Sequence, residues 1–480
     1  MNVLKKNKNK KIVDFNNWIN KEKKKILLKF LTCGSVDDGK STLIGRLLHD
    51  TKKIFKDQLS SLQKDSKRHG TQGENLDFSL LLDSLQDEKE QGITIDVAYR
   101  YFSTKKRKFI IVDAPGHSQY TRNMVTGASN CDVAILLIDA RKGLLKQTKR
   151  HSFIVTLLGI NYLIVAINKM DMVNYKEKIF LNIKNEFLKF SKFLSRKLNI
   201  IFIPISALFG ENIVFSNNLM PWYIGPTLLS YIEFINVEKK NNNNKSFIFP
   251  VQLINHPNSN FRGYSGTLIS GKIFIGQKVK ILPSGIFSKI KDIVSFDGIK
   301  KNAYFGQSIT ILLKDEIDIS RGDLIVNYNS KLFPQDEAIM NIVWMDYEKL
   351  ILGKSYFIKI AGKKIKACVK KIFYKINMDT FKKKKIKELN LNDIALVHVF
   401  FEEKIIFEKY KNNRILGGMI FIDIFNNRTV AVGMIKKNKI KISNNKNIVN
   451  KVFELELNSF ICKYFPHWGV KNLLNNLENN

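Results

Sequence analysis

A chain of 480 residues, of which 44% are hydrophobic, is long enough to bury the cores of two to four domains. Its formal net charge of +36 would suggest a nucleic-acid partner. The lysine runs, however, are spread along the chain beside asparagine, isoleucine and phenylalanine, so we attribute the excess of lysine to drift toward A/T-rich codons. Attraction to RNA or to a membrane surface is the alternative. The four cysteines lack CxxC spacing, which argues against disulfides and a zinc site. We see no apolar run of membrane-spanning length and no signal peptide, which argues against membrane insertion. Together these observations predict a cytoplasmic protein.

The first predicted element after a solvated arm (residues 1–25) is a phosphate-binding loop. The apolar run from Ile26 to Cys33 predicts a buried strand, and Lys40 to His49 predicts the helix that follows. Between them GSVDDGKS fits the pattern GxxxxGK[ST], whose backbone N–H groups wrap the α- and β-phosphates, with Lys40 on the β- and γ-phosphates and Ser41 on Mg²⁺. The alternative is a glycine-rich turn before an ordinary helix. The residues expected to bind nucleotide here are Gly34, Ser35, Val36, Asp37, Asp38, Gly39, Lys40, Ser41 and Thr42.

A long insertion separates this loop from the next motif. Its segments Gln58 to Lys67 and Asp77 to Gln91 have helical patterns. Thr94 then offers a hydroxyl and a carbonyl that can close over Mg²⁺ and the γ-phosphate. A plain turn threonine is the alternative.

The predicted strand Lys108 to Val112 runs into the loop Asp113-Ala-Pro-Gly-His117, which supplies the expected hydrolytic groups. Asp113 would hold a water of the Mg²⁺ shell, and the N–H of Gly116 would sense the γ-phosphate. His117 is the candidate for orienting the attacking water, a task that small GTPases give to glutamine; a capping or packing histidine is the alternative. The catalytic residues expected are His117, Lys40 and Thr94. The metal-binding residues expected are Ser41, Thr94 and Asp113. The loop is expected to contact the nucleotide through Asp113, Ala114, Pro115, Gly116 and His117.

Two later loops are expected to select the base. Asn168-Lys-Met-Asp171 follows the apolar strand Tyr162 to Ile167. The Asp171 carboxylate can accept two hydrogen bonds from N1–H and the 2-amino group of guanine, which adenine lacks. Asn168 would reach the other edge of the base, and the stem of Lys169 would lie along its face. The residues expected in these loops are Asn168, Lys169, Met170 and Asp171, with Ser206, Ala207 and Leu208 after the strand Ile200 to Pro204, where the Ala207 N–H points at guanine O6.

These motifs predict a GTPase domain over residues 26–240, with the site at the carboxyl ends of a doubly wound sheet and with GTP and Mg²⁺ as ligands. After the polar linker Asn241 to Asn244, short strands separated by regular turns predict β-barrels at 246–333 and 334–436. Residues 437–480 form a connector and tail. The predicted fold class is therefore an α/β P-loop GTPase domain followed by two small antiparallel β-barrels. The expected barrel strands are Phe247–Leu253, Gly263–Ser270, Gln277–Leu282 and Gln307–Leu312, and then Ala338–Trp344, Ser355–Ala361, Ile394–Phe401 and Met419–Ile424.

This domain order resembles the translational GTPases, including elongation factor Tu. Longer stretches are similar to the GTPase subunit (the large subunit, subunit 1) of bacterial sulfate adenylyltransferase. The resemblance covers roughly residues 26–475. The stretches that carry it are Phe30–Asp50, Asp65–Gly73, Glu90–Thr104, Phe261–Gly266, Asp315–Asp323, Ile358–Lys364, Phe453–Asn458 and Tyr464–Gly469.

The resemblance implies an energy-coupling role. In that family a small catalytic (ATP-sulfurylase) subunit makes adenosine 5′-phosphosulfate and pyrophosphate from ATP and sulfate, and GTP hydrolysis on the large subunit drives this uphill step. We therefore expect a heterodimer or higher assembly, with no specific nucleic acid and no membrane partner. The chain departs from related motifs at Asp38, where elongation factors carry histidine, and at Ala114 and Ser118, where the family has threonine and glutamate. The alternatives are a translation factor carrying aminoacyl-tRNA and a GTP-binding scaffold with degraded hydrolysis.

Overall fold

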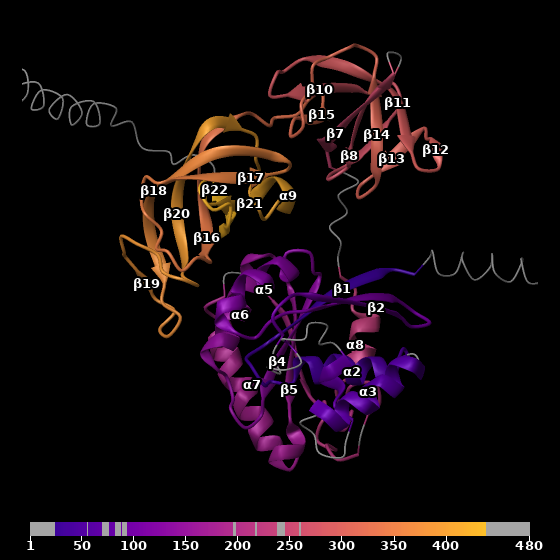
Figure 1. Ribbon diagram of the computed structural model, residues 1–480, viewed down its shortest axis with the longest axis vertical. Helices are drawn as coiled ribbons and strands as arrows, with labels where there is room; N and C mark the ends of the chain where they lie inside the picture. Colours follow the sequence, from indigo (N-terminus) through magenta and orange to yellow (C-terminus); the bar gives the residue numbers. More distant parts are fainter. Residues whose placement is uncertain are drawn as a thin grey trace, which may run out of the picture.

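The computed structural model describes residues 25–54, 56–69, 76–81, 88, 94–194, 198–216, 218–237, 245–258 and 261–437. The expected arm and tail, and most of the segment Asp77 to Gln91, lie outside these residues. The described chain forms an α/β domain and two β-barrels (Figure 1). The predicted fold class is confirmed.

A six-stranded sheet in the order β2-β3-β1-β4-β5-β6 forms the centre of the first domain. The edge strand β2 is antiparallel to β3, and the other neighbouring strands are parallel. The inner strands are almost continuously apolar because helices cover both faces of the sheet. The strand bounds are β1 Leu27–Cys33, β2 Ala98–Ser103, β3 Lys108–Asp113, β4 Val133–Asp139, β5 Tyr162–Asn168 and β6 Asn199–Pro204.

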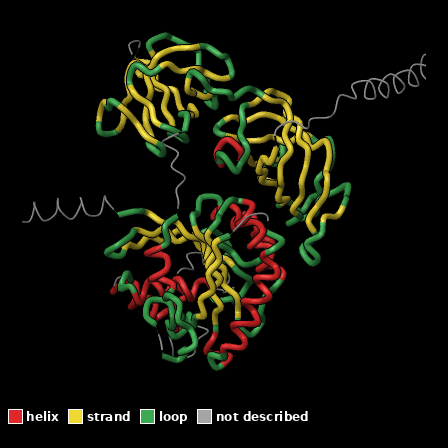
Figure 2. The backbone as a smooth tube through the Cα atoms, turned by 180° about the vertical axis from the view of Figure 1, so that it is seen from behind, coloured by secondary structure: helices red, strands yellow, loops and turns green. Residues whose placement is uncertain are grey.

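Alternate residues of each strand pack against helices on opposite faces of the sheet. On one face Leu136 and Ile138 join the core with α5, α6 and α7. On the other face Ile135 and Leu137 join α2 and α8. Figure 2 shows this layering from behind. The helix bounds are α2 Lys40–Asp50, α3 Lys56–His69, α5 Thr121–Ala128, α6 Lys146–Leu157, α7 Glu177–Ser191 and α8 Leu228–Phe234, with 3-10 turns η1 Phe78–Leu81, η2 Ser118–Tyr120 and η3 Met170–Val173.

The first barrel closes six antiparallel strands in the order β10-β15-β7-β8-β14-β11, because β10 also pairs with β11. The sequence pattern did not indicate β11, whose register against β14 shifts between Ile290 and Asp292. Such a bulge interrupts the alternation that marks a strand in a sequence. The strand bounds are β7 Ile248–Asn258, β8 Phe261–Thr267, β9 Lys272–Phe274, β10 Lys278–Leu282, β11 Phe287–Ser295, β12 Gly298–Ile299, β13 Asn302–Tyr304, β14 Ser308–Leu313 and β15 Leu324–Asn327.

The second barrel closes in the order β17-β21-β22-β16-β20-β18, with β17 paired to β18. Its longest strand, β18, was also not anticipated, and it carries two register shifts against β20. The element bounds are β16 Gln335–Trp344, β17 Ser355–Ile360, β18 Lys363–Ile376, β19 Lys383–Lys384, β20 Ile394–Ile405, α9 Arg414–Gly417, β21 Gly418–Ile422 and β22 Thr429–Lys437.

The second barrel packs against the α5–α7 side of the α/β domain (Figure 1). Met345 and Tyr410 of the barrel belong to the same buried cluster as Phe153 of α6. The Tyr410 hydroxyl donates to the Leu158 carbonyl at 3.1 Å, and the Arg414 guanidinium donates to the Gly159 carbonyl at 2.6 Å. Because these contacts are buried or partly buried and well formed, they join the barrel to the domain as one packed unit.

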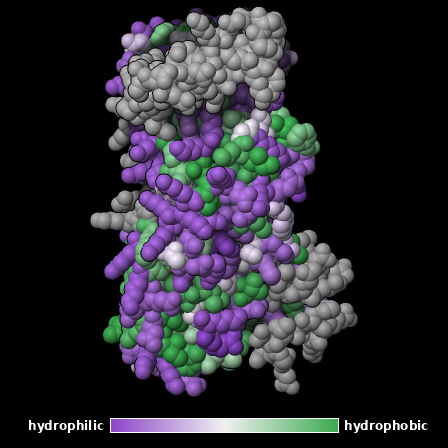
Figure 3. Space-filling view, turned by 90° about the vertical axis from the view of Figure 1, so that its left-hand side faces the viewer, coloured by the Kyte–Doolittle hydropathy of each residue, from purple (hydrophilic) through white to green (hydrophobic). Residues whose placement is uncertain are grey.

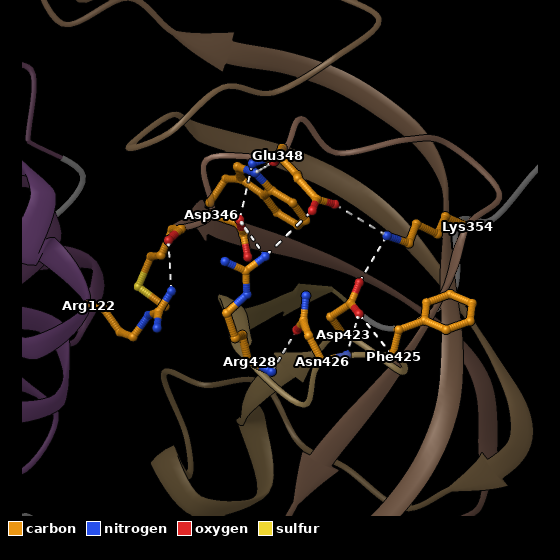
Figure 4. A network of polar contacts seen from close by, with 10 residues as sticks. Arg122, Asp346, Glu348, Lys354, Asp423, Phe425, Asn426 and Arg428 are labelled. Atoms are coloured by element: carbon orange, nitrogen blue, oxygen red, sulfur yellow. Dashed lines mark hydrogen bonds and ion pairs between the residues drawn. The ribbon is translucent and has the colours of Figure 1, made fainter.

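Figure 4 shows the barrel loop that faces α5. Arg122 of α5 donates to the Met345 carbonyl at 3.3 Å. The next residue, Asp346, is buried and lies 3.8 Å from the Arg428 guanidinium. Lys354 bonds Asp423 at 2.9 Å and so ties β17 to the turn between β21 and β22. The network holds in place the loop that Arg122 contacts.

Candidate nucleotide site

The carboxyl ends of the five parallel strands bring the predicted motifs to one edge of the sheet. β1 leads into the phosphate loop, β3 ends at Asp113, β4 at Asp139 and β5 at Asn168, and β6 leads to Ser206. A pocket of about 310 Å³ opens there. Its predicted lining residues are Val36, Asp37, Gly39, Lys40, Ser41, Thr42, Thr94, Gly116, His117, Asn168, Lys169, Asp171, Ala207 and Leu208.

The other predicted site residues do not line the pocket. Asp113 is buried next to Ser41, and Asp38 is buried inside the phosphate loop. The rest, Gly34, Ser35, Ala114, Pro115, Met170 and Ser206, are buried residues of the same loops. These residues lie in the loops that form the pocket but do not line its interior.

The phosphate loop is shaped by its own polar groups. The Asp38 carboxylate accepts a hydrogen bond of 2.6 Å from the Ser35 N–H. Lys40 is buried, and its ammonium group donates to the Ser35 carbonyl at 2.7 Å. Burial lowers the pKa of Lys40, although the charges of Asp113 and Asp38 act against this shift. A buried ammonium group at the pocket wall is suited to an anion that supplies the missing negative charge.

Gly39 has φ +88°, in the left-handed region that favours glycine. A Cβ there would overlap the amide nitrogen of Asn168. We therefore expect Gly39→Ala to weaken binding of both GTP and GDP by about tenfold or more, since the clash costs roughly 1.4 kcal/mol or more beyond the backbone strain. Nucleotide titration calorimetry would measure this loss.

Gly143→Ala is the matched control for this prediction. Gly143 also has positive φ (+67°), but a Cβ there meets nothing within 4 Å. Its substitution is expected to cost a similar backbone strain without the loss of affinity. Equal affinities in the two variants would show that the contact between Gly39 and Asn168 is unimportant for binding.

The three residues expected to hold Mg²⁺ come together in space. The Ser41 hydroxyl donates to Asp113 Oδ2 at 3.3 Å and lies 3.4 Å from the Thr94 hydroxyl. The other carboxylate oxygen of Asp113 accepts a bond of 2.7 Å from Thr32. Burial raises the pKa of Asp113, and the bonds from Thr32 and Ser41 favour its ionised form. Two hydroxyls beside one carboxylate form a set of oxygen donors that fits Mg²⁺.

Among the residues that the structure describes, no group of three or more His, Cys, Asp or Glu side chains could hold a metal ion. Asp113 is the one carboxylate among the three residues expected to hold Mg²⁺, so phosphate oxygens and water would have to supply further ligands.

The segments expected to approach the γ-phosphate are held by contacts at or near their backbones. Glu88 accepts hydrogen bonds from the N–H groups of Ile95 and Asp96, next to Thr94. A Cβ on Gly116 would lie 2.6 Å from the Lys40 nitrogen, so Gly116 allows this close approach. The exposed side chain of His117 lines the pocket at the start of η2. Thr94, Gly116 and His117 thus face the same end of the pocket.

Asn168 and Ala207 occupy positions that differ from the expected ones. Sequence analysis placed Asn168 at the edge of the base and aimed the Ala207 N–H at guanine O6. In the structure the Ala207 N–H donates to Asn168 Oδ1 at 2.9 Å, and Asn168 Nδ2 donates to the Asp38 carbonyl at 2.8 Å. Since both of its polar atoms are engaged in this way, Asn168 braces the phosphate loop against the loop after β6.

Asp139 organises the end of the pocket lined by Arg141 and Lys169, a role that the sequence motifs did not reveal. It is fully buried at the end of β4, where both of its oxygens accept bonds from Arg141, at 3.0 and 2.7 Å. The Lys169 ammonium group lies 3.2 Å from the same carboxylate. Burial raises the pKa of Asp139, but the bonds from Arg141 and the charge of Lys169 outweigh it and lower the pKa to about 2. The carboxylate therefore stays ionised and fixes two cations at the pocket.

Three lining residues were not predicted, namely Ser79, Arg141 and Met172. Arg141 is the most informative of them, because its charge acts on both Asp139 and Asp171. Its only signal in the sequence was its place two residues after the end of a buried strand. Arg46 was also missed; it donates to the Leu208 carbonyl at 3.0 Å and joins α2 to the loop after β6.

A buried histidine lies below the phosphate loop. Burial, followed by the positive charges of Lys40 and Arg150, lowers the pKa of His151 to about 3. The unfolded chain binds this proton with a pKa near 6.5, so its contribution to stability is complete above pH 6.5 and is lost as the pH falls toward 3. At pH 5 the expected loss is about 2 kcal/mol.

The measurement is the free energy of unfolding between pH 5 and 7.5, compared between wild type and His151→Gln. We expect the difference between the two proteins to change with pH in the direction given above. His256→Gln, at an exposed position, is the control and should leave the profile unchanged. Parallel profiles for wild type and His151→Gln would contradict the prediction.

Within the described part of the chain, every helix is too short or too polar to cross a membrane.

Comparison with known proteins agrees with this architecture. The family described as "Elongation factor Tu GTP binding domain" matches residues 25–243, and the family "GTP-eEF1A C-terminal domain-like" matches residues 337–436. A solved structure of sup35 complexed with GMPPNP is a distant match, with a TM-score of 0.40 and 21% identity over 87% of this chain and 95% of that chain.

Curated relatives match almost the whole chain. Sulfate adenylyltransferase subunit 1 of Buchnera aphidicola subsp. Acyrthosiphon pisum (strain APS) is 59% identical over 96% of this chain and 97% of its own. The protein of the same name is 55% identical in Erwinia tasmaniensis (95% of this chain, 96% of the relative) and 53% identical in Salmonella arizonae (95% of each). With these identities and this domain order, the chain belongs to the family of sulfate adenylyltransferase subunit 1, within the superfamily of translational GTPases.

Proposed function

We propose that this chain is the GTP-hydrolysing, energy-coupling subunit of sulfate adenylyltransferase. The observation that carries the proposal is the convergence of Lys40, Ser41, Thr94 and His117 on one pocket in a member of this family. A partner catalytic subunit makes adenosine 5′-phosphosulfate and pyrophosphate from ATP and sulfate. That reaction is uphill, because the product anhydride is high in energy. GTP hydrolysis on this chain supplies the driving force.

Each pocket residue has a role in this proposal. The phosphate loop and Lys40 bind the triphosphate and offset its charge. Ser41, Thr94 and Asp113 would hold Mg²⁺, which would offset the negative charge of the triphosphate. His117 orients the attacking water, and Asp171 selects guanine. Asp139 keeps Lys169 and Arg141 in position beside the base.

The contacts of η2 support a route from the γ-phosphate to the barrels. Gly116 and His117 precede Ser118, whose carbonyl accepts a hydrogen bond of 2.8 Å from Asn392 of the second barrel. Four residues further along the chain, Arg122 bonds the Met345 carbonyl of the same barrel. A change at the γ-phosphate end of the pocket therefore acts on a segment that contacts the barrel directly. The affinity of a partner bound to the barrels would respond to that change only as far as the partner binds one arrangement of η2 and the barrel better than the other.

The test is sulfate-dependent pyrophosphate release by this chain together with the small ATP-sulfurylase subunit. We expect product accumulation to rise steeply with GTP, and a non-hydrolysable GTP analogue to support association of the subunits without sustained accumulation. Ser41→Ala, which removes an expected Mg²⁺ ligand, should lower the GTP-dependent part alone. If the two subunits fail to associate, or if GTP leaves product accumulation unchanged, a GTP-binding scaffold becomes the better description.

A further inference from the structure

One part of the second barrel carries a local excess of positive charge. Residues 354–387, which contain β17, β18 and β19, carry thirteen lysines and one acidic residue, Asp379. The whole first-barrel region, residues 245–333, carries twelve lysines and arginines against six acidic residues. Coding drift alone raises the lysine content of exposed positions everywhere, so it does not account for this local excess.

Five of these lysines share the outer face of β17 and β18, which we call the lysine face. Lys359 of β17 stands directly opposite Lys364 of β18 in the ladder, and both are exposed. Lys366 follows on the same side of β18. A register shift between Val369 and Lys371 then leaves two consecutive lysines exposed. The lysine face consists of Lys359, Lys364, Lys366, Lys370 and Lys371.

The lysine face is not neutralised by the described residues around it. Nearby lysines outside the face do have carboxylate partners: Lys363 pairs with Glu403, and Lys375 with Asp393. No carboxylate of the described chain lies within 4.0 Å of the five ammonium groups. Like charges directly opposite each other in a sheet repel and destabilise it. A bound anion would therefore relieve the repulsion between Lys359 and Lys364.

Aromatic rings hold some of these ammonium groups in place. The Lys364 nitrogen lies 3.9 Å from the centre of the Phe357 ring, and the Lys370 nitrogen lies 4.1 Å from the Phe400 ring. Such cation–π contacts favour defined positions of the side chains over free rotation. The same arrangement continues at β19, where Lys383 lies 4.9 Å from Tyr374. The charges are therefore partly preorganised above the sheet.

The composition of this surface favours a polyanion over a protein partner. All residues from 354 to 387 are described, and none of their large hydrophobic side chains is exposed. A protein interface needs an apolar core, in which lysine is depleted. Figure 3 shows the side of the molecule that lies on the left in Figure 1, where hydrophilic residues predominate around separate hydrophobic patches. Many like charges, with only partly buried rings such as Phe357 and Phe400 between them, suit the phosphates of a nucleic acid, which are bound with release of counterions.

We propose that the lysine face binds nucleic acid through its phosphate groups, without reading the bases. The exposed cluster Lys382, Lys383, Lys384, Lys385 and Lys387 extends the surface along the chain beyond β18. The proposal is independent of the nucleotide pocket and of sulfate chemistry, because it rests on a different domain and on different residues.

The test uses the full chain with saturating GDP and a fluorescent single-stranded RNA of 20 nucleotides, followed by anisotropy at several salt concentrations. A duplex DNA of equal length in a second arm distinguishes the two sources of phosphate. In the test variant Lys359, Lys364, Lys366, Lys370 and Lys371 are replaced by glutamine. We expect its affinity at 50 mM salt to fall at least tenfold. The slope of log K against log salt should become shallower by up to about 3.5 on single-stranded RNA, since each phosphate contact contributes about 0.7.

The matched control replaces five exposed lysines of the first barrel by glutamine, namely Lys272, Lys289, Lys291, Lys301 and Lys314. The two variants have the same net charge. The control is expected to keep most of the affinity and most of the salt slope. Thermal unfolding of both variants confirms that the barrels remain folded.

Two results would overturn the proposal. Equal losses of RNA affinity in the two variants would mean that net charge attracts the ligand and that no face is preferred. Retained RNA binding by the test variant, together with lost association with the small catalytic subunit, would identify the lysine face as a protein docking surface instead.

Discussion

His117→Ala is expected to slow GTP hydrolysis in the complete complex by about 10² or more, while GTP affinity stays near the wild-type value. The reason is the position of His117. It lines the pocket and stands between Gly116 and the first residue of η2. Its side chain is exposed and lies edge-on to Tyr120, with 6.4 Å between the ring centres, so no buried contact is lost on substitution. A loss of rate without a loss of affinity is expected of a residue that acts on the attacking water.

The measurement is single-turnover hydrolysis of bound GTP, with affinity determined separately. His117→Gln is the informative second variant, because glutamine performs the orienting task in small GTPases and should recover part of the rate. Gln119→Ala, at a neighbouring exposed position outside the pocket lining, is the control. Normal hydrolysis by His117→Ala would make His117 a structural residue of the turn.

The motifs of the nucleotide site could be predicted because they depend on short, contiguous stretches of sequence. The phosphate loop needs glycine at Gly39, where φ is positive, and a lysine and hydroxyl at fixed spacing after it. The strands β4 and β5 are apolar along nearly their whole length, which only a doubly covered sheet requires. Their order along the chain then places the motifs at one edge.

The parts that could not be predicted depend on pairs of residues far apart in the sequence. Asn168 bonds the Asp38 carbonyl across 130 positions and the Ala207 N–H across 39. The spacing of apolar residues along the sequence does not indicate hydrogen bonds between residues so far apart. The orientation of Arg141 toward the pocket follows from the buried Asp139 carboxylate, which looked like an ordinary strand end. In β18 the bulges break the alternation of buried and exposed residues, so the sequence did not indicate a strand there.

Asp171→Asn is expected to exchange guanine for xanthine as the preferred base. In wild type the carboxylate can only accept hydrogen bonds, which matches N1–H and the 2-amino group of guanine. Asparagine can donate as well as accept, and xanthine carries an oxygen where guanine carries the amino group. Each well-placed bidentate contact to a base contributes about 1–3 kcal/mol of discrimination, so GTP affinity should fall by about 10- to 100-fold.

The control and the readout make this prediction specific to the base. Asp37→Asn removes the same charge from the same pocket, at a left-handed position (φ +62°) that asparagine tolerates. It should change the affinities for GTP and XTP alike, whereas Asp171→Asn should invert their ratio. The neighbouring Arg141 charge, which acts on Asp171, remains in both proteins. In the complete complex, XTP should then replace GTP in driving product accumulation by the Asp171→Asn variant. An unchanged preference for GTP would remove Asp171 from the base pocket.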